Sequence, residues 1–105
     1  MEGEASIERR RLVARWVHSH EEDDDSSTVL RPADHELPPS RGRTRLELRE
    51  DGRMVEDGPG PDDRLVEATG AWELKRGEVL ILRGPDGDRA QRVLAAEPDR
   101  LVLAK

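Results

Sequence analysis

The second half of the chain alternates between apolar and polar positions as consecutive β-strands do. In residues 64–75, Trp72 and Leu74 share one parity with small residues, whereas Glu67 and Glu73 share the other, which is the period of a half-buried strand. Three further apolar runs follow, separated by short segments whose residues favour turns. Connections this short can join only neighbouring antiparallel strands, so this half is predicted to form an antiparallel meander.

The first half shows the same alternation, interrupted by longer connections. Leu46 and Leu48 alternate with charged residues, and the following Asp51 and Gly52 suit the left-handed conformations of a tight hairpin. Residues 31–42 hold three prolines and are predicted to be a loop, of a length typical of functional or disordered segments. Strands are predicted at about 12–20, 27–31, 43–50, 53–57, 64–75, 78–83, 88–96 and 100–104.

These segments predict an all-β fold. Eight antiparallel strands on short turns can close into a barrel, which removes the exposed sheet edges that promote aggregation. We predict a small antiparallel up-and-down β-barrel whose interior has room for side chains or for one small ligand. Residues 1–11 are predicted to precede it with a short helical turn capped by Ser6, and residues 12–105 to form the barrel domain.

The composition restricts both the core and the partners. Leucine, valine and isoleucine together supply only about a fifth of the residues, so the core is predicted to be thin. Charged residues of both signs make up 40% of the chain, the net charge is −6, and the only aromatic residues are Trp16 and Trp72. A nucleic-acid partner is not expected, because there is no basic stripe with interleaved aromatic side chains.

The chain contains no cysteine, which excludes disulfides, thiolate metal sites and cysteine nucleophiles and fits a reducing compartment. The N-terminal residues lack the apolar core of a signal peptide, and no apolar run has the length of a membrane span. We therefore expect a cytoplasmic protein. Residues 58–61 are rich in glycine and proline but lack the lysine and the following helix of a phosphate loop, and no cofactor is expected.

Two short motifs resemble those of a known family. Ala14, Arg15 and Trp16 resemble the Gly-x-Trp of the opening strand of lipocalin-like, or calycin, barrels, with alanine in place of the glycine. Gly70, Ala71 and Trp72 supply a second Gly-x-Trp in mid-chain, and the order of segments resembles that of small bacterial lipocalin-like domains. The resemblance implies a barrel with Trp16 at its closed end and any ligand at its open end, and it implies no reaction.

The histidines after Trp16 are the first candidate for chemistry. His18 and His20 share the parity of Trp16, so on one strand both would point toward the barrel interior. Glu22 or His35 could add a third ligand for zinc, iron or manganese. The alternatives are that one histidine acts as a general acid or base, or that the strand leaves the barrel at residue 18 and both histidines are solvated rim groups beside an acidic run.

The long loop supplies the second candidate. Arg31, Arg41 and Arg43 carry forked guanidinium groups that bind carboxylate or phosphate, and the nearby prolines would stiffen the loop before binding. The alternative is that such arginines pair with neighbouring carboxylates of the chain itself, as surface arginines often do.

Binding of a small apolar or amphipathic molecule in the barrel interior is the function that these patterns favour. The predicted ligand-binding residues are Trp16, His18, His20, Arg31, Arg41, Arg43, Leu46, Leu48 and Trp72. One alternative is a small isomerase or cyclase that uses His18 or His20. Another is a protein-interaction module with a filled barrel, for which Val13, Val17 and Val102 on the outward parity would form the contact surface.

Overall fold

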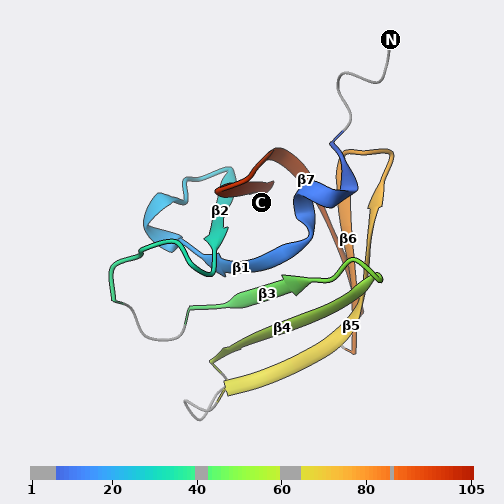
Figure 1. The fold of residues 1–105 in the computed structure, drawn as a ribbon, viewed down its shortest axis with the longest axis horizontal. Coiled ribbons are helices and arrows are strands. Elements are labelled where there is room, and N and C mark those ends of the chain that lie inside the picture. Colours follow the sequence, from blue (N-terminus) through green and yellow to red (C-terminus); the bar gives the residue numbers. More distant parts are fainter. Residues whose placement is uncertain (1–6, 40–42, 60–64, 86) are drawn as a thin grey trace.

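The computed structural model describes residues 7–39, 43–59, 65–85 and 87–105. Within these residues the regular structure consists of two short 3-10 turns and eight strands (Figure 1). The elements are η2 (Arg9–Leu12), β1 (Ala14–His18), η3 (His20–Glu22), β2 (Ser27–Pro32), β3 (Arg45–Leu48), β4 (Arg53–Pro59), β5 (Leu65–Lys75), β6 (Val79–Gly84), β7 (Gly87–Glu97) and β8 (Arg100–Ala104). Among these residues, no helix has the length and apolar character needed to cross a bilayer.

The strands form one closed barrel in the order β1-β2-β8-β7-β6-β5-β4-β3. Every neighbouring pair is antiparallel. The predicted all-β fold and the closed antiparallel barrel of eight strands are therefore confirmed. The meander from β3 to β8 follows the chain, as its short turns require.

The position of β1 departs from the up-and-down order that the sequence predicted. Trp16 of β1 pairs with Pro32 of β2 on one side and with Leu46 of β3 on the other, so β1 lies between β2 and β3 (Figure 1). Because β1 separates β2 from β3 in the barrel, the chain must pass β1 on its way from β2 to β3. The twelve residues 33–44 that connect the two strands are enough for this. We call residues 33–39 and 43–44 the crossover segment.

Strand β1 is shorter than the predicted strand at both ends. Leu12 belongs to η2, where its carbonyl accepts a hydrogen bond of 2.9 Å from Nε1 of Trp16. The predicted helical turn therefore lies at Arg9–Leu12, without a side-chain cap at its start, and Ser6 is outside the described residues. At the other end the chain leaves the sheet after His18 and turns into η3.

The barrel interior is filled by apolar side chains that share the inward parity of their strands. Leu12 of η2 is fully buried among them and covers one end of the barrel. The buried cluster consists of Leu12, Trp16, Leu30, Leu46, Leu48, Met54, Trp72, Leu80, Leu82, Val93, Leu101 and Leu103.

Candidate functional site

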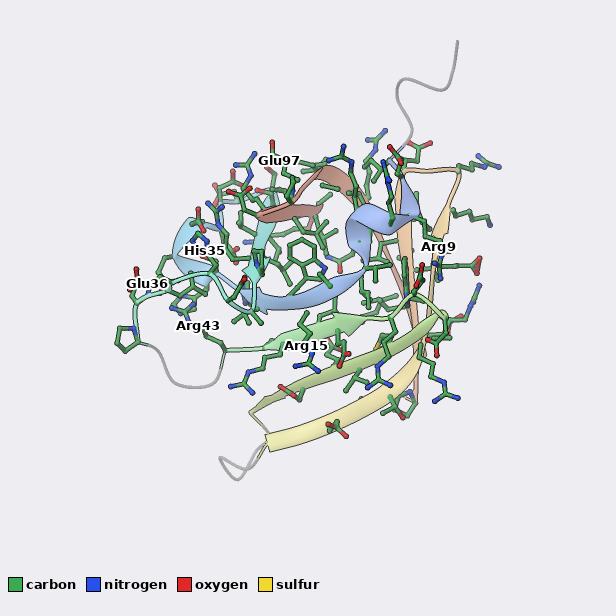
Figure 2. The ribbon with its side chains drawn as sticks, viewed as in Figure 1. Arg9, Arg15, His35, Glu36, Arg43 and Glu97 are labelled. Carbon is green, nitrogen blue, oxygen red and sulfur yellow. The ribbon has the colours of Figure 1, made fainter. Side chains whose placement is uncertain are left out.

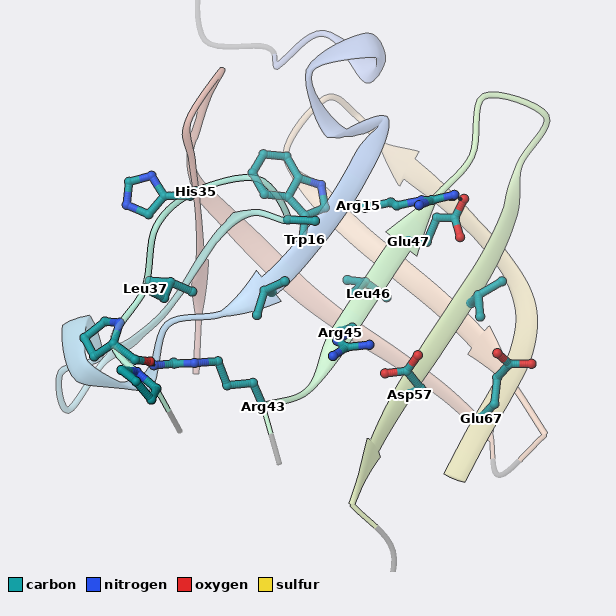
Figure 3. A pocket seen from close by; sticks show the side chains of 15 residues that line it. Arg15, Trp16, His35, Leu37, Arg43, Arg45, Leu46, Glu47, Asp57 and Glu67 are labelled. Carbon is teal, nitrogen blue, oxygen red and sulfur yellow. Dashed lines mark hydrogen bonds and ion pairs between the residues drawn. The ribbon is translucent and has the colours of Figure 1, made fainter. Parts of the chain in front are cut away.

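A hollow of about 630 Å³ lies on the outside of the barrel, next to the crossover segment (Figure 3). We call it the crossover groove. It is lined by Arg15, Trp16, Val17, Ala33, His35, Leu37, Pro38, Pro39, Arg43, Arg45, Leu46, Glu47, Val55, Asp57 and Glu67. The crossover segment supplies a wall, and β1, β3, β4 and β5 supply the floor. Most floor residues alternate with buried core residues, which places the groove on the outer face of the sheet.

One cross-strand row runs along the floor of the groove. Val17 of β1 is the register partner of Arg45 of β3. Arg45 is in turn the partner of Asp57 of β4, and Asp57 is the partner of Glu67 of β5. Directly opposed residues of an antiparallel pair have Cβ atoms about 4.5–5.5 Å apart. The row therefore brings together one apolar side chain, one cation and two anions.

The charged residues of this row, Arg45, Asp57 and Glu67, form no ion pairs with one another. Figure 3 shows Arg45 and Asp57 turned toward each other, but no ion pair within 4.0 Å joins these side chains or any other described residue to them. Oδ1 of Asp57 is buried and has no hydrogen-bond partner among the described residues. Like charges directly opposite on neighbouring strands, as for Asp57 and Glu67, are destabilising. A ligand in the groove can offer opposite charges to the Arg45 guanidinium and to the sides of the Asp57 and Glu67 carboxylates that line it.

Arg43 fixes the wall of the groove. Its guanidinium donates to both carboxylate oxygens of Glu21, at 2.9 and 2.5 Å. It also donates to the carbonyl oxygens of His18 at 3.0 Å and Pro38 at 2.6 Å. Because these acceptors come from β1, η3 and the crossover segment, Arg43 holds the three together (Figure 2).

Arg31 of β2 makes a similar set of hydrogen bonds outside the groove. It donates to both carboxylate oxygens of Glu22, at 2.8 and 2.6 Å, and to the carbonyl oxygen of Asp99 at 3.0 Å. Arg31 and Arg43 thus bind carboxylates of the chain itself, although η3 provides these carboxylates and not the residues nearest in sequence. Arg41 lies outside the described residues.

These pairs predict a pH dependence of stability. The Arg43 guanidinium lowers the pKa of Glu21 from 4.5 to about 2, and the Arg31 guanidinium, helped by the Ser19 hydroxyl, lowers the pKa of Glu22 from 4.5 to about 2. A carboxyl whose pKa is lower in the folded state stabilises the fold above its unfolded pKa. The contribution of both groups is therefore complete above about pH 4.5 and is lost as the pH falls toward 2.

Thermal unfolding measured between pH 6 and pH 2 tests the Arg31–Glu22 pair. We expect the Glu22→Gln variant to have a lower Tm than the wild type near pH 6, and a smaller fall in Tm between pH 4.5 and 2. Glu36 is exposed on the crossover segment, so the Tm of Glu36→Gln should fall with pH as steeply as that of the wild type. Equal slopes for all three proteins would contradict a role for the Arg31–Glu22 pair.

The histidines are placed at the end of β1 and beyond it. Nε2 of His18 lies 2.7 Å from Oδ2 of Asp23, whose Oδ1 accepts a hydrogen bond of 2.8 Å from the backbone N–H of Val29. His20 is exposed on η3, with its ring edge-on to His18 at 6.1 Å. The prediction that both rings point into the barrel is therefore wrong for His20, because the strand ends at His18.

No metal centre is assembled by the predicted ligands. His35 lies on the wall of the crossover groove, and Glu22 is bound by Arg31. Within the part of the chain that the structure describes, no three histidine, aspartate or glutamate side chains form a group that could hold a metal ion.

The remaining predicted residues belong to the filled interior. Trp16 and Leu46 also border the crossover groove, whereas Leu48 and Trp72 do not. Nε1 of Trp72 donates to the carbonyl oxygen of Arg49 at 2.7 Å, and the Arg9 guanidinium lies 4.5 Å from the centre of its ring.

Sequence reasoning missed Arg45, Asp57 and Glu67. Their outward parity was visible in the alternation, but their adjacency depends on the strand register. Comparisons of the chain with protein-family models, with curated proteins and with solved structures give no match. The geometry of the site is therefore the basis for inferring function.

Proposed function

We propose that the crossover groove binds a small amphipathic molecule. Its volume of about 630 Å³ falls within the usual range of small-molecule sites, which combine apolar walls with a few polar groups. Leu37, Pro38 and Val55 offer apolar surface, and Arg45 and Asp57 offer polar groups. The observation that carries the proposal is that Oδ1 of Asp57 and the neighbouring Arg45 guanidinium have no hydrogen-bond or ion-pair partner among the described residues.

The barrel interior supports a ligand site less well. The core around Trp16 and Leu48 is closed, with both side chains 1% exposed. A smaller hollow of about 280 Å³ lies near the opposite end, beside Met54 and Leu82. At this hollow Glu56 and Arg89 already form an ion pair, with 2.6 Å between a guanidinium nitrogen and a carboxylate oxygen. The interior offers no comparable unsatisfied polar group among the described residues.

We also propose that the chain is a lipocalin-like barrel with its ligand site on the outside. The closed barrel of eight antiparallel strands supports this, as does the burial of Trp16 against η2. The position of β1 between β2 and β3 departs from the up-and-down order that the resemblance implies.

Backbone amide NMR shifts test the groove directly. We titrate the protein with short aliphatic amines, carboxylates and amino acids, and expect the largest shifts at groove residues such as Leu37, Arg45 and Val55. The Leu37→Ser variant removes apolar wall surface and is expected to weaken binding about tenfold, which corresponds to about 1.4 kcal/mol. Leu94→Ser is the matched control, because Leu94 is 50% exposed and lies outside the groove.

The same titration separates the alternatives. Shifts confined to Met54 and Leu82 would contradict the groove and favour the interior site. No shift with any of these molecules would favour a protein-interaction module. For such a module the expected valine surface is not available, since Val13 packs against the core, Val102 is buried and Val17 lies in the groove. The edge of β5 at residues 67–69 is a better candidate, because the pairing of β6 with β5 begins at Ala71 and Gly70 lies against the backbone of Arg83.

A further inference from the structure

We propose that the ligand of the crossover groove is a zwitterion, an α-amino acid with an apolar side chain. This inference rests on the proposed function of the groove. Its carboxylate would bind Arg45, and its ammonium group would bind Asp57 and Glu67.

Several charged groups in and beside the groove already have partners. Arg43 is bound by Glu21. Arg15 lies 3.7 Å from Glu47, which Arg49, outside the groove, also approaches at 3.1 Å. The charged groups of the floor that remain without a described partner are therefore Arg45, Asp57 and Glu67.

Arg45, Asp57 and Glu67 together favour a ligand that carries a negative and a positive group close to each other. A guanidinium has only donors and binds a carboxylate through two parallel hydrogen bonds. The Asp57 and Glu67 carboxylates line the groove as acceptors that have no ion-pair partner among the described residues, and an ammonium group offers three N–H donors. Because Arg45 and Asp57 are cross-strand neighbours, the anionic and cationic groups of the ligand must lie close together, as they do on the α-carbon of an amino acid.

A ligand with a single charge fits less well. A simple carboxylate at Arg45 would bring a third negative charge beside Asp57 and Glu67. A simple amine at Asp57 would relieve the repulsion between the two carboxylates but would lie next to the Arg45 cation. The zwitterion opposes each charge with its counterpart, and oppositely charged neighbours on a sheet attract where like charges repel.

The apolar surfaces of the groove indicate the side chain of the ligand. Val17 begins the row that contains Arg45, Asp57 and Glu67. Val55 lies two residues before Asp57 on β4 and so on the same face of the sheet, and Leu37 faces the floor from the crossover segment. A branched aliphatic side chain beside the amino-acid head group would cover these apolar surfaces.

Three probes of matched shape test the inference. They are L-leucine, 4-methylpentanoate, which lacks the amine, and 3-methylbutylamine, which lacks the carboxylate. Their Kd values are measured by NMR titration of the full chain near pH 7. We expect L-leucine to bind at least about tenfold more tightly than either analogue.

Variants assign each half of the recognition. Arg45→Gln should remove the preference for L-leucine over 3-methylbutylamine, and Asp57→Asn should remove its preference over 4-methylpentanoate. Arg92→Gln is the control, because Arg92 is exposed on β7 and lies outside the groove. Asp57→Asn is also expected to keep or raise the Tm, because it removes a charge that opposes Glu67.

The outcomes separate this inference from the proposed function. If 4-methylpentanoate or 3-methylbutylamine binds in the groove as tightly as L-leucine, the zwitterion is overturned while the groove remains a ligand site. If L-leucine fails to bind but another amphipathic molecule shifts groove resonances, the zwitterion is likewise overturned and the groove remains a ligand site. If no molecule shifts them, both proposals fail. A fall in Tm for Asp57→Asn would assign Asp57 to the fold and overturn its role as a ligand-binding group.

Discussion

Replacement of Gly70 by alanine is expected to destabilise the barrel by about 3 kcal/mol, because the new methyl group has no space. A Cβ atom on Gly70 would lie 1.9 Å from the carbonyl oxygen of Arg83 and 3.0 Å from its carbonyl carbon. Both atoms belong to the backbone of β6, so no side-chain rotation can relieve the overlap. The strands β5 and β6 must separate where their pairing begins, at Ala71 and Arg83.

Urea unfolding followed by tryptophan fluorescence measures this loss. The matched control is Gly84→Ala, in the same part of the barrel. A Cβ atom on Gly84 would have its nearest contact at 3.7 Å, with the terminal methyl of Met54, so its effect should stay within about 1 kcal/mol. Equal destabilisation by both variants would show that the contact with Arg83 does not decide the residue at position 70.

Replacement of Trp16 by alanine is expected to cost about 4 kcal/mol, in the range measured for large aromatic residues of protein cores. The Trp16 side chain is 1% exposed and lies within the filled interior. Its loss leaves a cavity and also removes the hydrogen bond from Nε1 to the carbonyl oxygen of Leu12. The turn η2, which covers this end of the barrel, would then lose one of its attachments.

Two further variants separate these contributions. Trp16→Phe keeps most of the apolar volume but not the N–H donor, and should cost about 1–3 kcal/mol through the unsatisfied carbonyl of Leu12. Leu94→Ala changes a side chain that is 50% exposed and should cost less than about 0.5 kcal/mol. Free energies of unfolding from circular dichroism would contradict the assignment if Trp16→Ala cost no more than Leu94→Ala.

The fold was predictable wherever short turns connect the strands. Residues 49–52 connect β3 to β4, with Gly52 but not Asp51 in the left-handed region, and other short connections fix the order of the strands up to β8. Alternation shows which face of a strand is buried, but it does not identify the neighbours of that strand. Residues 33–44 are long enough to pass another strand, so the position of β1 between β2 and β3 could not be read from the pattern.

The candidate site was less predictable, because its chemistry depends on distant partners. Arg31 and Arg43 have the residue type and loop context of ligand-binding groups, yet η3 folds back and supplies Glu22 and Glu21 to them. Arg45 has the same side chain and remains unpaired among the described residues. Arg45 differs from Arg43 because the strand register places Arg45 beside Asp57, whereas Arg43 reaches Glu21 of η3.

The pairing of β2 with β8 also affects the biosynthesis of the protein. Ser27 pairs with Ala104 and Leu30 with Leu101, so strands formed early in translation cannot find this partner until the last of the eight has left the ribosome. Until then the nascent sheet has open edges at β2 and β7, and such edges can pair with other chains. Closure of the barrel therefore waits for β8, and the protection of the β2 and β7 edges comes only with that last strand.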